Sequence, residues 1–271
     1  MLRLPHAAQG PGRRMNPLCG IHRGRALVSS PCALTSSISR RLYKSMLIDG
    51  GDMIDVKRYL GAVVREVESR EHEGKPARVV VATRDYDTTV EDLWDALTNP
   101  ERIPRWFLPV SGDLKLGGRY ELKGNASGSV TRCEAPRHLG LTWEFGGSVS
   151  WLEVILANAP GGGTRLRLEH MAHVSPFWDD YGPGATGVGW ELGLMGLGMH
   201  LESGGAAVDS AAVESWTTSD EGKAFITASS EGWGQADVTR GEDAAAAKAR
   251  AARTTAFYTG APPPDVRHPG T

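Results

Sequence analysis

Two histidines at the end of a strand-like segment are the residues best suited to metal chemistry. His170 and His173 form an H-x-x-H pair, and Asp179 and Asp180 follow a few residues later. A zinc site needs three or four ligands that converge on one point. Residues three apart on a strand point to opposite faces, so this pair does not converge without a bend. The pattern therefore favours one inward histidine and one loop histidine, and we predict no metal.

A glycine-rich stretch at residues 182–187 fits the dinucleotide-binding pattern G-x-G-x-x-G. A true instance follows a strand and opens a helix within a βαβ unit. Here SPFWDDY precedes the glycines and the neighbouring strand patterns are antiparallel, so we interpret them as the entry to a helix. The sequence also contains no G-x-S-x-G, C-x-x-C or P-loop motif, and we predict no cofactor.

Aromatic side chains are more numerous than a small sheet-and-helix core normally requires. Such a set is usually core, but it can also line an apolar pocket in which a few polar groups orient a ligand. If this pocket is catalytic, His170 and Tyr120 are the candidates for general acid or base. The predicted ligand-binding residues are Trp106, Phe107, Tyr120, Trp143, Trp151, His170, Trp190 and Met195.

Composition and charge indicate a globular chain with an uneven charge distribution. No run of eighteen apolar residues occurs, which excludes a membrane-spanning helix. Residues 1–52 carry eight Arg or Lys and two Asp, so a segment of +6 precedes a body of −8, for a net charge of −2. An acidic body argues against a nucleic-acid partner, because phosphate binding needs a basic surface. The three cysteines indicate no disulfide framework and favour a reducing, cytoplasmic setting.

The first 52 residues are rich in Arg and Ser and show no sustained helical or strand period. Their composition resembles an organelle transit peptide, and a translation start placed too far upstream, with Met46 or Met53 as the initiator, also explains them. We favour the second explanation because regular patterning begins at Met53. From there, residues 53–76 indicate an amphipathic helix that ends at a Gly-Lys-Pro break.

Strand patterns dominate the middle of the chain. Residues 77–87 form a Val-rich strand pattern, and Thr88 or Thr89 then suits the N-cap of a helix that ends at Asn99. The later strand patterns cover residues 110–114, 119–123, 128–134, 138–145, 149–157 and 164–171. In the last of these, Leu166, Leu168 and His170 are predicted to face the core. Short turns between the strands predict an antiparallel sheet with helices on one face.

The longest periodic apolar segment is residues 184–203, and it predicts a helix with Val188, Leu192, Met195 and Met199 on one face. Its glycines let another backbone approach closely or leave room beside the helix, and both outcomes suit a helix that lies across a curved sheet. Such a helix is either packed into a core, which is the commoner case, or covers a ligand cavity. Helical patterns at 210–217, 220–237 and 244–258 form a predicted extension over residues 205–260. Residues 261–271, with three consecutive prolines, are predicted to be a disordered tail.

Four segments agree in order and spacing with one family. They are LWDALTNPERIPRWF at 93–107, GDLKLGGRYEL at 112–122, RCEAPRHLGLTWEF at 132–145 and TRLRLEHMAH at 164–173. The sequence resembles the SRPBCC superfamily of START-type helix-grip proteins, and within it the branch similar to the activator of heat shock protein 90 ATPase homologue. The resemblance implies an α+β helix-grip domain over residues 77–204. In it a curved antiparallel sheet, led by residues 77–87, is wrapped around the long helix with a cavity between them.

The resemblance leaves several functions open, because the superfamily includes lipid carriers, polyketide cyclases and aromatases, and co-chaperones. Our leading hypothesis is non-catalytic binding of a small hydrophobic ligand, lipid- or polyketide-like, between the sheet and the long helix. The first alternative is a cyclase or aromatase that uses His170 and Tyr120. The second is a co-chaperone-like module that contacts a protein partner through the C-terminal helices.

Overall fold

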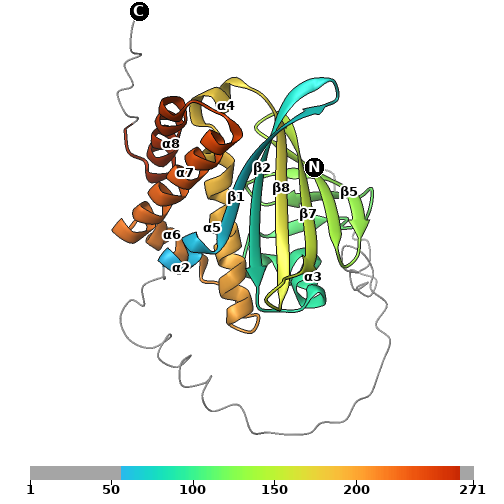
Figure 1. The fold of residues 1–271 in the computed structure, drawn as a ribbon. Helices are drawn as coiled ribbons and strands as arrows, with labels where there is room; N and C mark the ends of the chain where they lie inside the picture. Colours follow the sequence, from blue (N-terminus) through green and yellow to red (C-terminus); the bar gives the residue numbers. More distant parts are fainter. Residues whose placement is uncertain (1–55, 263–271) are drawn as a thin grey trace, which may run out of the picture.

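The structure of the protein, a computed structural model, describes residues 56–262. Its main element is an antiparallel eight-stranded sheet with the order β1-β2-β8-β7-β6-β5-β4-β3. Figure 1 shows the sheet with most of the helices along its left side and α3 at its lower end. The strands are Val63–His72 (β1), Lys75–Tyr86 (β2), Val110–Gly112 (β3), Arg119–Leu122 (β4), Ser127–Glu134 (β5), His138–Phe145 (β6), Ser148–Asn158 (β7) and Thr164–His173 (β8).

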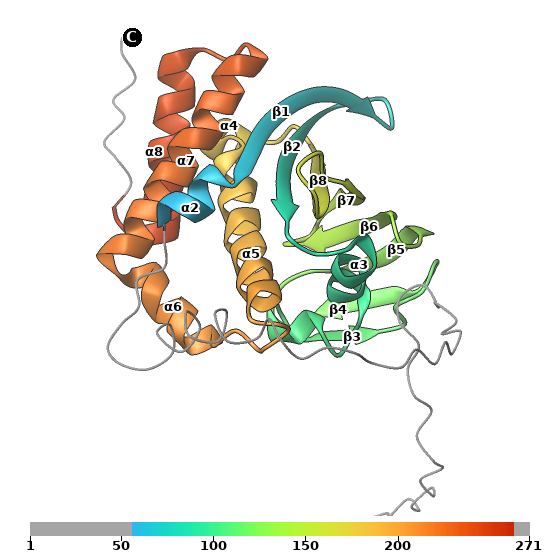
Figure 2. The same ribbon diagram turned by 60° about the horizontal axis from the view of Figure 1, so that its bottom comes forward.

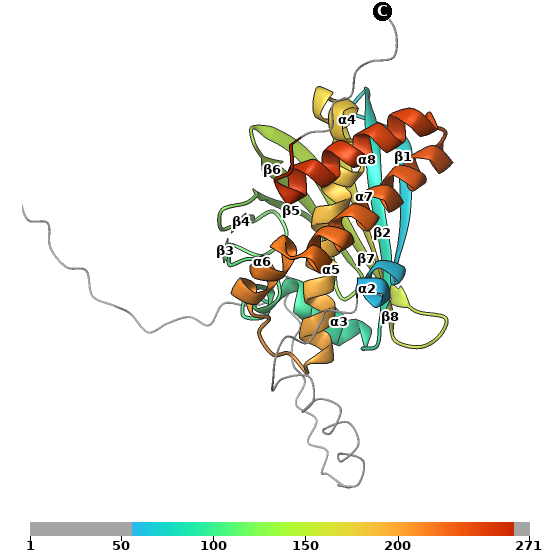
Figure 3. The ribbon, with the colours of Figure 1, turned by 90° about the vertical axis from the view of Figure 1, so that its left-hand side faces the viewer.

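Helices cover the concave side of this sheet. They are Val56–Gly61 (α2), Val90–Thr98 (α3), the 3-10 helix Ile103–Arg105 (η1), Pro176–Tyr181 (α4), Gly184–Glu202 (α5), Ser210–Thr218 (α6), Asp220–Arg240 (α7) and Ala244–Thr259 (α8). Figure 2 shows the sheet curving around α5, and Figure 3 shows α7 and α8 as an outer layer over α5. The predicted fold, a curved antiparallel sheet around a long helix with further helices after it, is confirmed.

The long helix α5 is buried on two sides. Val188 and Leu197 belong to the main core together with side chains of the sheet, whereas Met195 packs against Tyr59 of α2 and Phe225 of α7. The predicted helix is confirmed, but its burial is not limited to one face. Because the sheet and α7 enclose it, Glu191 and Gly187 are buried as well.

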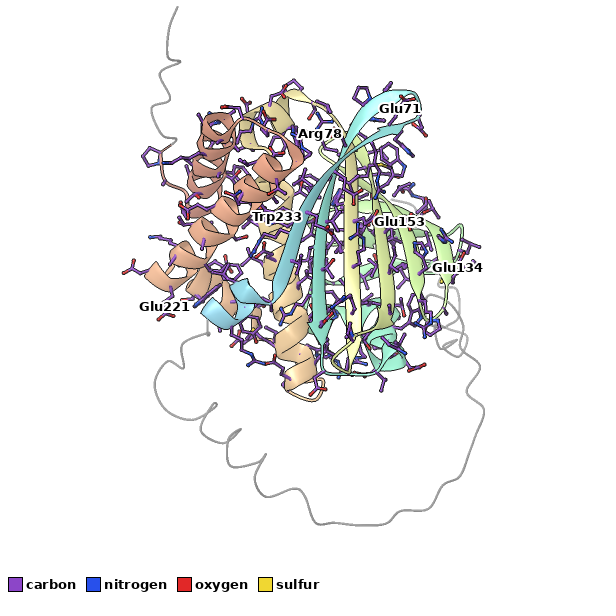
Figure 4. The ribbon with its side chains drawn as sticks, in the orientation of Figure 1. Glu71, Arg78, Glu134, Glu153, Glu221 and Trp233 are labelled. Carbon is purple, nitrogen blue, oxygen red and sulfur yellow. The ribbon has the colours of Figure 1, made fainter. Side chains whose placement is uncertain are left out.

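The interface between α5, α7 and β1 is tightly packed. The buried ring of Trp233 lies so close to Gly187 that a Cβ on this glycine would be 2.2 Å from the ring atom Cε2. Nearby, Glu191 accepts two hydrogen bonds of 2.7 Å from the Arg65 guanidinium on β1. Figure 4 shows Trp233 between α7 and the sheet. These contacts fix the position of α5 against the outer helix layer.

The prediction of a helix over residues 53–76 is wrong for the described part of that range. Only α2 is helical, and β1 follows it as an edge strand that pairs with β2 from Val63 opposite Arg84 to His72 opposite Lys75. The sheet order is therefore not led by residues 77–87. Valines spaced four apart suit either structure, and the hydrogen bonds that β2 offers decide for the strand. The hairpin turn at Glu73–Gly74 has positive φ at both residues, which suits a two-residue connection.

The other predicted elements agree with the structure within a few residues. The Thr89 Oγ1 accepts a hydrogen bond from the Asp92 amide and caps α3, and the strand patterns between 110 and 171 are β3 to β8. The three C-terminal helical patterns correspond to α6, α7 and α8. Cys133 on β5 is disulfide-bonded, which corrects the expectation of reduced cysteines at this position. The predictions for residues 1–52 and for most of the tail lie outside the described residues.

Candidate ligand-binding site

An apolar cavity of about 90 Å³ lies between the concave face of the sheet and α5. Aliphatic side chains from six strands form the largest part of its wall, with Leu139, Val154 and Leu168 as examples. The helix contributes Trp190, Gly193 and Leu194, and the segment around η1 adds further apolar side chains. A wall of this composition favours apolar ligands, because it offers almost no polar surface.

Four large rings form one side of this cavity. The Trp106 and Phe107 rings are stacked with centroids 5.3 Å apart, and Phe107 is stacked on Trp190 at 6.2 Å. Trp143 of β6 meets Trp190 edge-on at 5.2 Å. Centroid distances of about 4.5 to 7 Å are typical of favourable aromatic pairs. The rings thus form a continuous aromatic cluster from the η1 segment, across α5, to the sheet.

Glycines of α5 allow the η1 segment to approach the helix. A Cβ on Gly196 would lie 2.7 Å from the backbone oxygen of Trp106, and one on Gly193 would lie 3.3 Å from Cε2 of Phe107. The Trp106 indole is held by its Nε1, which donates to the Ala96 carbonyl oxygen of α3 at 2.9 Å. The backbone of residues 106–107 is therefore positioned by α3 on one side and by the bare surface of α5 on the other.

His170 of β8 anchors two of the rings through a chain of hydrogen bonds. The Trp190 Nε1 donates to His170 Nδ1 at 2.9 Å, which leaves the proton of the neutral imidazole on Nε2. This Nε2 lies 2.8 Å from Ser150 Oγ, and the Ser150 hydroxyl donates to the Trp143 carbonyl oxygen at 3.1 Å. Burial lowers the pKa of His170 to about 4, so the ring is neutral at physiological pH. Both of its nitrogens are already engaged.

Tyr120 of β4 is the second polar residue at this site. Its hydroxyl donates to the Thr142 carbonyl oxygen at 2.7 Å. Burial raises the pKa of Tyr120, because the phenolate form would lose its hydration. The phenol therefore keeps its proton, and that proton is already used in a hydrogen bond to β6. Neither of the two predicted acid–base candidates is poised to exchange a proton with a guest molecule.

Comparison with known proteins now places this fold in a family. The family described as Activator of Hsp90 ATPase homolog 1-like protein matches residues 87–202. The crystal structure of CalU16 from Micromonospora echinospora is 33% identical, covers 65% of this chain and 98% of its own, and has a TM-score of 0.53. The chain belongs to the Activator of Hsp90 ATPase homolog 1-like family.

A second structure of the same relative agrees with this assignment. The solution NMR structure of CalU16 is 32% identical, covers 66% of this chain and 97% of its own, and has a TM-score of 0.56. The residues matched to the Activator of Hsp90 ATPase homolog 1-like family are less than half of the chain, so the likeness to CalU16 extends beyond them. No curated protein matches the sequence.

Most of the predicted ligand-binding residues of this family member come together in the structure. Trp106, Phe107, Tyr120, Trp143 and Trp190 line the cavity. His170 does not line it, but its ring lies 5.9 Å from the rings of Trp143 and Trp190. The sheet and α5 thus gather residues that are up to 84 positions apart in the sequence. That these residues bind a ligand stays a prediction.

Trp151 and Met195 lie elsewhere. Trp151 of β7 packs against His72 and His173, with ring centroids at 4.0 and 5.1 Å. The alternation of β7 explains this, because Leu152, Val154 and Leu156 are the buried residues of that strand. Met195 belongs to the cluster on the α7 side of α5. Neither residue is part of the cavity wall.

Sequence reasoning overlooked the aliphatic wall and Ser150. The wall follows from period-two alternation in β5 to β8, and extending the alternation of β8 to its neighbours would have found it. Ser150 had no such signal, because its role depends on being placed beside His170 by strand pairing: Leu152 is directly opposite His170. The contact between Ser150 and the His170 imidazole is therefore set by the pairing register of β7 and β8.

Within residues 56–262, no group of three or more His, Cys, Asp or Glu side chains could hold a metal ion. His170 and His173 lie on β8 in different surroundings, one beside the cavity rings and the other beside Trp151. In the same part of the chain, no helix has the length and apolar character needed to cross a membrane.

Proposed function

We propose that the protein binds a small apolar ligand in the cavity between the sheet and α5 and does so without covalent catalysis. The observation that carries this proposal is the wall itself, which combines aliphatic side chains with five aromatic ones. Burial of apolar ligand surface against such a wall is favourable by about 25 cal/mol per Å². A ligand without hydrogen-bonding groups gives up no hydrogen bond to water when it enters the cavity.

The state of the polar groups supports binding over catalysis. His170 is neutral and uses both nitrogens within the protein, and Tyr120 uses its hydroxyl proton on Thr142. A general acid or base needs a proton-transfer atom within reach of the substrate. Among the described residues of the cavity wall, Tyr120 is the one with an ionisable side chain. The cavity therefore suits retention of a molecule better than its conversion.

The proposal is tested by filling the cavity. Val154 lines it, whereas Val149 on the same strand is about half exposed, so Val154→Phe and Val149→Phe form a matched pair. Uncharged apolar probes, pyrene and 1-tetradecanol, are added to each protein, and complexes are counted by native mass spectrometry. Wild type and Val149→Phe are expected to bind a probe with one-to-one stoichiometry, and Val154→Phe to bind at least tenfold less.

Two results would contradict the proposal. One is that the folded wild type retains neither probe, and the other is that Val154→Phe binds as well as Val149→Phe. Circular dichroism of both variants establishes that they are folded. If a protein partner is later found for α6 to α8, its binding is expected to be equal in the two variants, because these helices lie outside the cavity wall.

A further inference from the structure

The Phe107 ring occupies the space between two indoles. It is stacked against Trp106 with an interplanar angle of 27° and against Trp190 with an angle of 17°. The phenyl ring is therefore stacked on both indoles. Two indoles that both stack on one ring are a suitable receptor for a flat π-system, because such a molecule can contact an aromatic ring with each face.

The two outer rings are held by hydrogen bonds, and the middle ring is not. Trp106 donates its Nε1 proton to the Ala96 carbonyl oxygen, and Trp190 donates its own to His170 Nδ1, each at 2.9 Å. Phe107 has no polar side-chain atom, is half-buried, and lies between η1 and β3 outside any helix or strand. Rotation of the phenyl ring out of this position breaks neither of the two indole hydrogen bonds.

The middle ring rests on a glycine. The nearest atoms to a Cβ built on Gly193 are Cε2 and Cδ2 of Phe107, at 3.3 and 3.6 Å. When the ring leaves, the helix presents bare backbone at this point, and the space opens into the cavity that Gly193 and Phe107 both line. The cavity itself, at about 90 Å³, is well below the roughly 300 Å³ of a typical ligand pocket. A ligand therefore needs room that the phenyl ring now fills.

We propose that Phe107 is a displaceable internal occupant of a slot for flat aromatic ligands, formed by Trp106 and Trp190 over Gly193. This inference rests on the proposed function and adds a ligand class and a specificity-determining residue to it. An uncharged polycyclic aromatic molecule replaces the phenyl ring with a larger surface and keeps both stacking contacts. A flexible aliphatic chain of similar size has no flat face for the indoles and gains less from the exchange.

The test compares Phe107→Ala and Phe107→Leu with Phe257→Ala. The leucine keeps an apolar side chain without a flat ring, and Phe257 is an exposed phenylalanine of α8 away from the cavity wall. Pyrene is titrated into each protein with tryptophan excitation, and energy transfer to pyrene gives the dissociation constant. Competition with 1-tetradecanol gives the affinity for an aliphatic molecule of comparable size.

Both Phe107 variants are expected to bind pyrene about tenfold more tightly than wild type, since they no longer have to displace the ring. The affinity for 1-tetradecanol is expected to rise less, and Phe257→Ala to leave both affinities unchanged. The inference is overturned if wild type binds the probes but folded Phe107→Ala and Phe107→Leu bind pyrene no better. It is also overturned if pyrene and 1-tetradecanol gain equally. If no protein binds either probe, the proposed function itself fails.

Discussion

The two sides of α5 use the same device, an aromatic ring on a helical glycine, with different tightness. On the α7 side, Trp233 is fully buried and lies on Gly187 at a distance that excludes any Cβ. On the sheet side, Phe107 is half-buried, and its nearest ring atom is 3.3 Å from the position of a Cβ on Gly193, beside a cavity. The first side fixes the helix, and the second leaves apolar space next to it.

Charged groups follow the same division. The packed side contains the Arg65–Glu191 ion pair, in which the Glu191 side chain is 1% exposed. The cavity side contains no charged side chain among its described lining residues. This difference predicts that contacts on the α7 side hold α5 in place. The Phe107 ring on the cavity side can then move away without unfolding the protein. Three predictions test this division, from the largest expected effect to the smallest.

The largest effect is expected for the buried ion pair. Arg65→Met leaves the Glu191 carboxylate buried without its partner, and loss of one partner of such a pair costs about 3 to 5 kcal/mol. Urea unfolding measures this loss. Arg165→Met is the matched control, because its bidentate pair with Asp85 is 43% exposed on both sides and contributes less than about 1 kcal/mol.

The double variant Arg65→Met/Glu191→Met separates a charge effect from a packing effect. It removes the unpaired carboxylate and is expected to recover most of the lost free energy of unfolding. If Arg65→Met costs no more than Arg165→Met, the back of α5 is not the rigid side of the helix.

The second effect is a pH dependence on the cavity side. The pKa of His170 in the folded protein is about 4, below the value of about 6.5 expected when unfolded. The folded state therefore disfavours the bound proton, and its stability is complete above pH 6.5 and falls as the pH drops from 6.5 to 4. The expected loss is about 3 kcal/mol over this window.

Urea unfolding between pH 4 and 7.5 measures this slope in wild type and in His170→Gln. Glutamine does not titrate, so its slope is expected to be smaller by about one proton. His200, whose pKa is also lowered by burial, is present in both proteins and contributes equally to both slopes. Equal slopes would mean that His170 is not the neutral anchor of Trp190.

The smallest effect compares the two glycines directly. Gly187→Ala places a Cβ against the fixed Trp233 ring and is expected to reduce the free energy of unfolding by about 2 kcal/mol. Gly193→Ala meets only the outer edge of the Phe107 ring, and alanine's higher helix propensity, about 1 kcal/mol, offsets the contact. No net loss is expected there. Thermal unfolding of the pair tests this, and equal losses would remove the distinction between the two sides.

The sequence by itself determined the local elements whose pattern depends on near neighbours. In β8, alternation placed Leu166, Leu168 and His170 inward, because side chains on a strand alternate between faces whatever lies beyond them. The cap of α3 at Thr89 was likewise a local hydrogen bond. Among the cavity rings, strand alternation applies only to Tyr120 on β4 and Trp143 on β6.

Only the tertiary structure decided which side of α5 faces the cavity and which segment forms the sheet edge. Helical periodicity identifies apolar positions but not which neighbour covers them, so Met195 was assigned to the cavity although it lies against Tyr59 and Phe225. The spacing of the β1 valines is compatible with a helix, and hydrogen bonding to the backbone of β2 makes the segment a strand. Backbone hydrogen bonds and packing between distant segments carry this information, and the local order of residues does not.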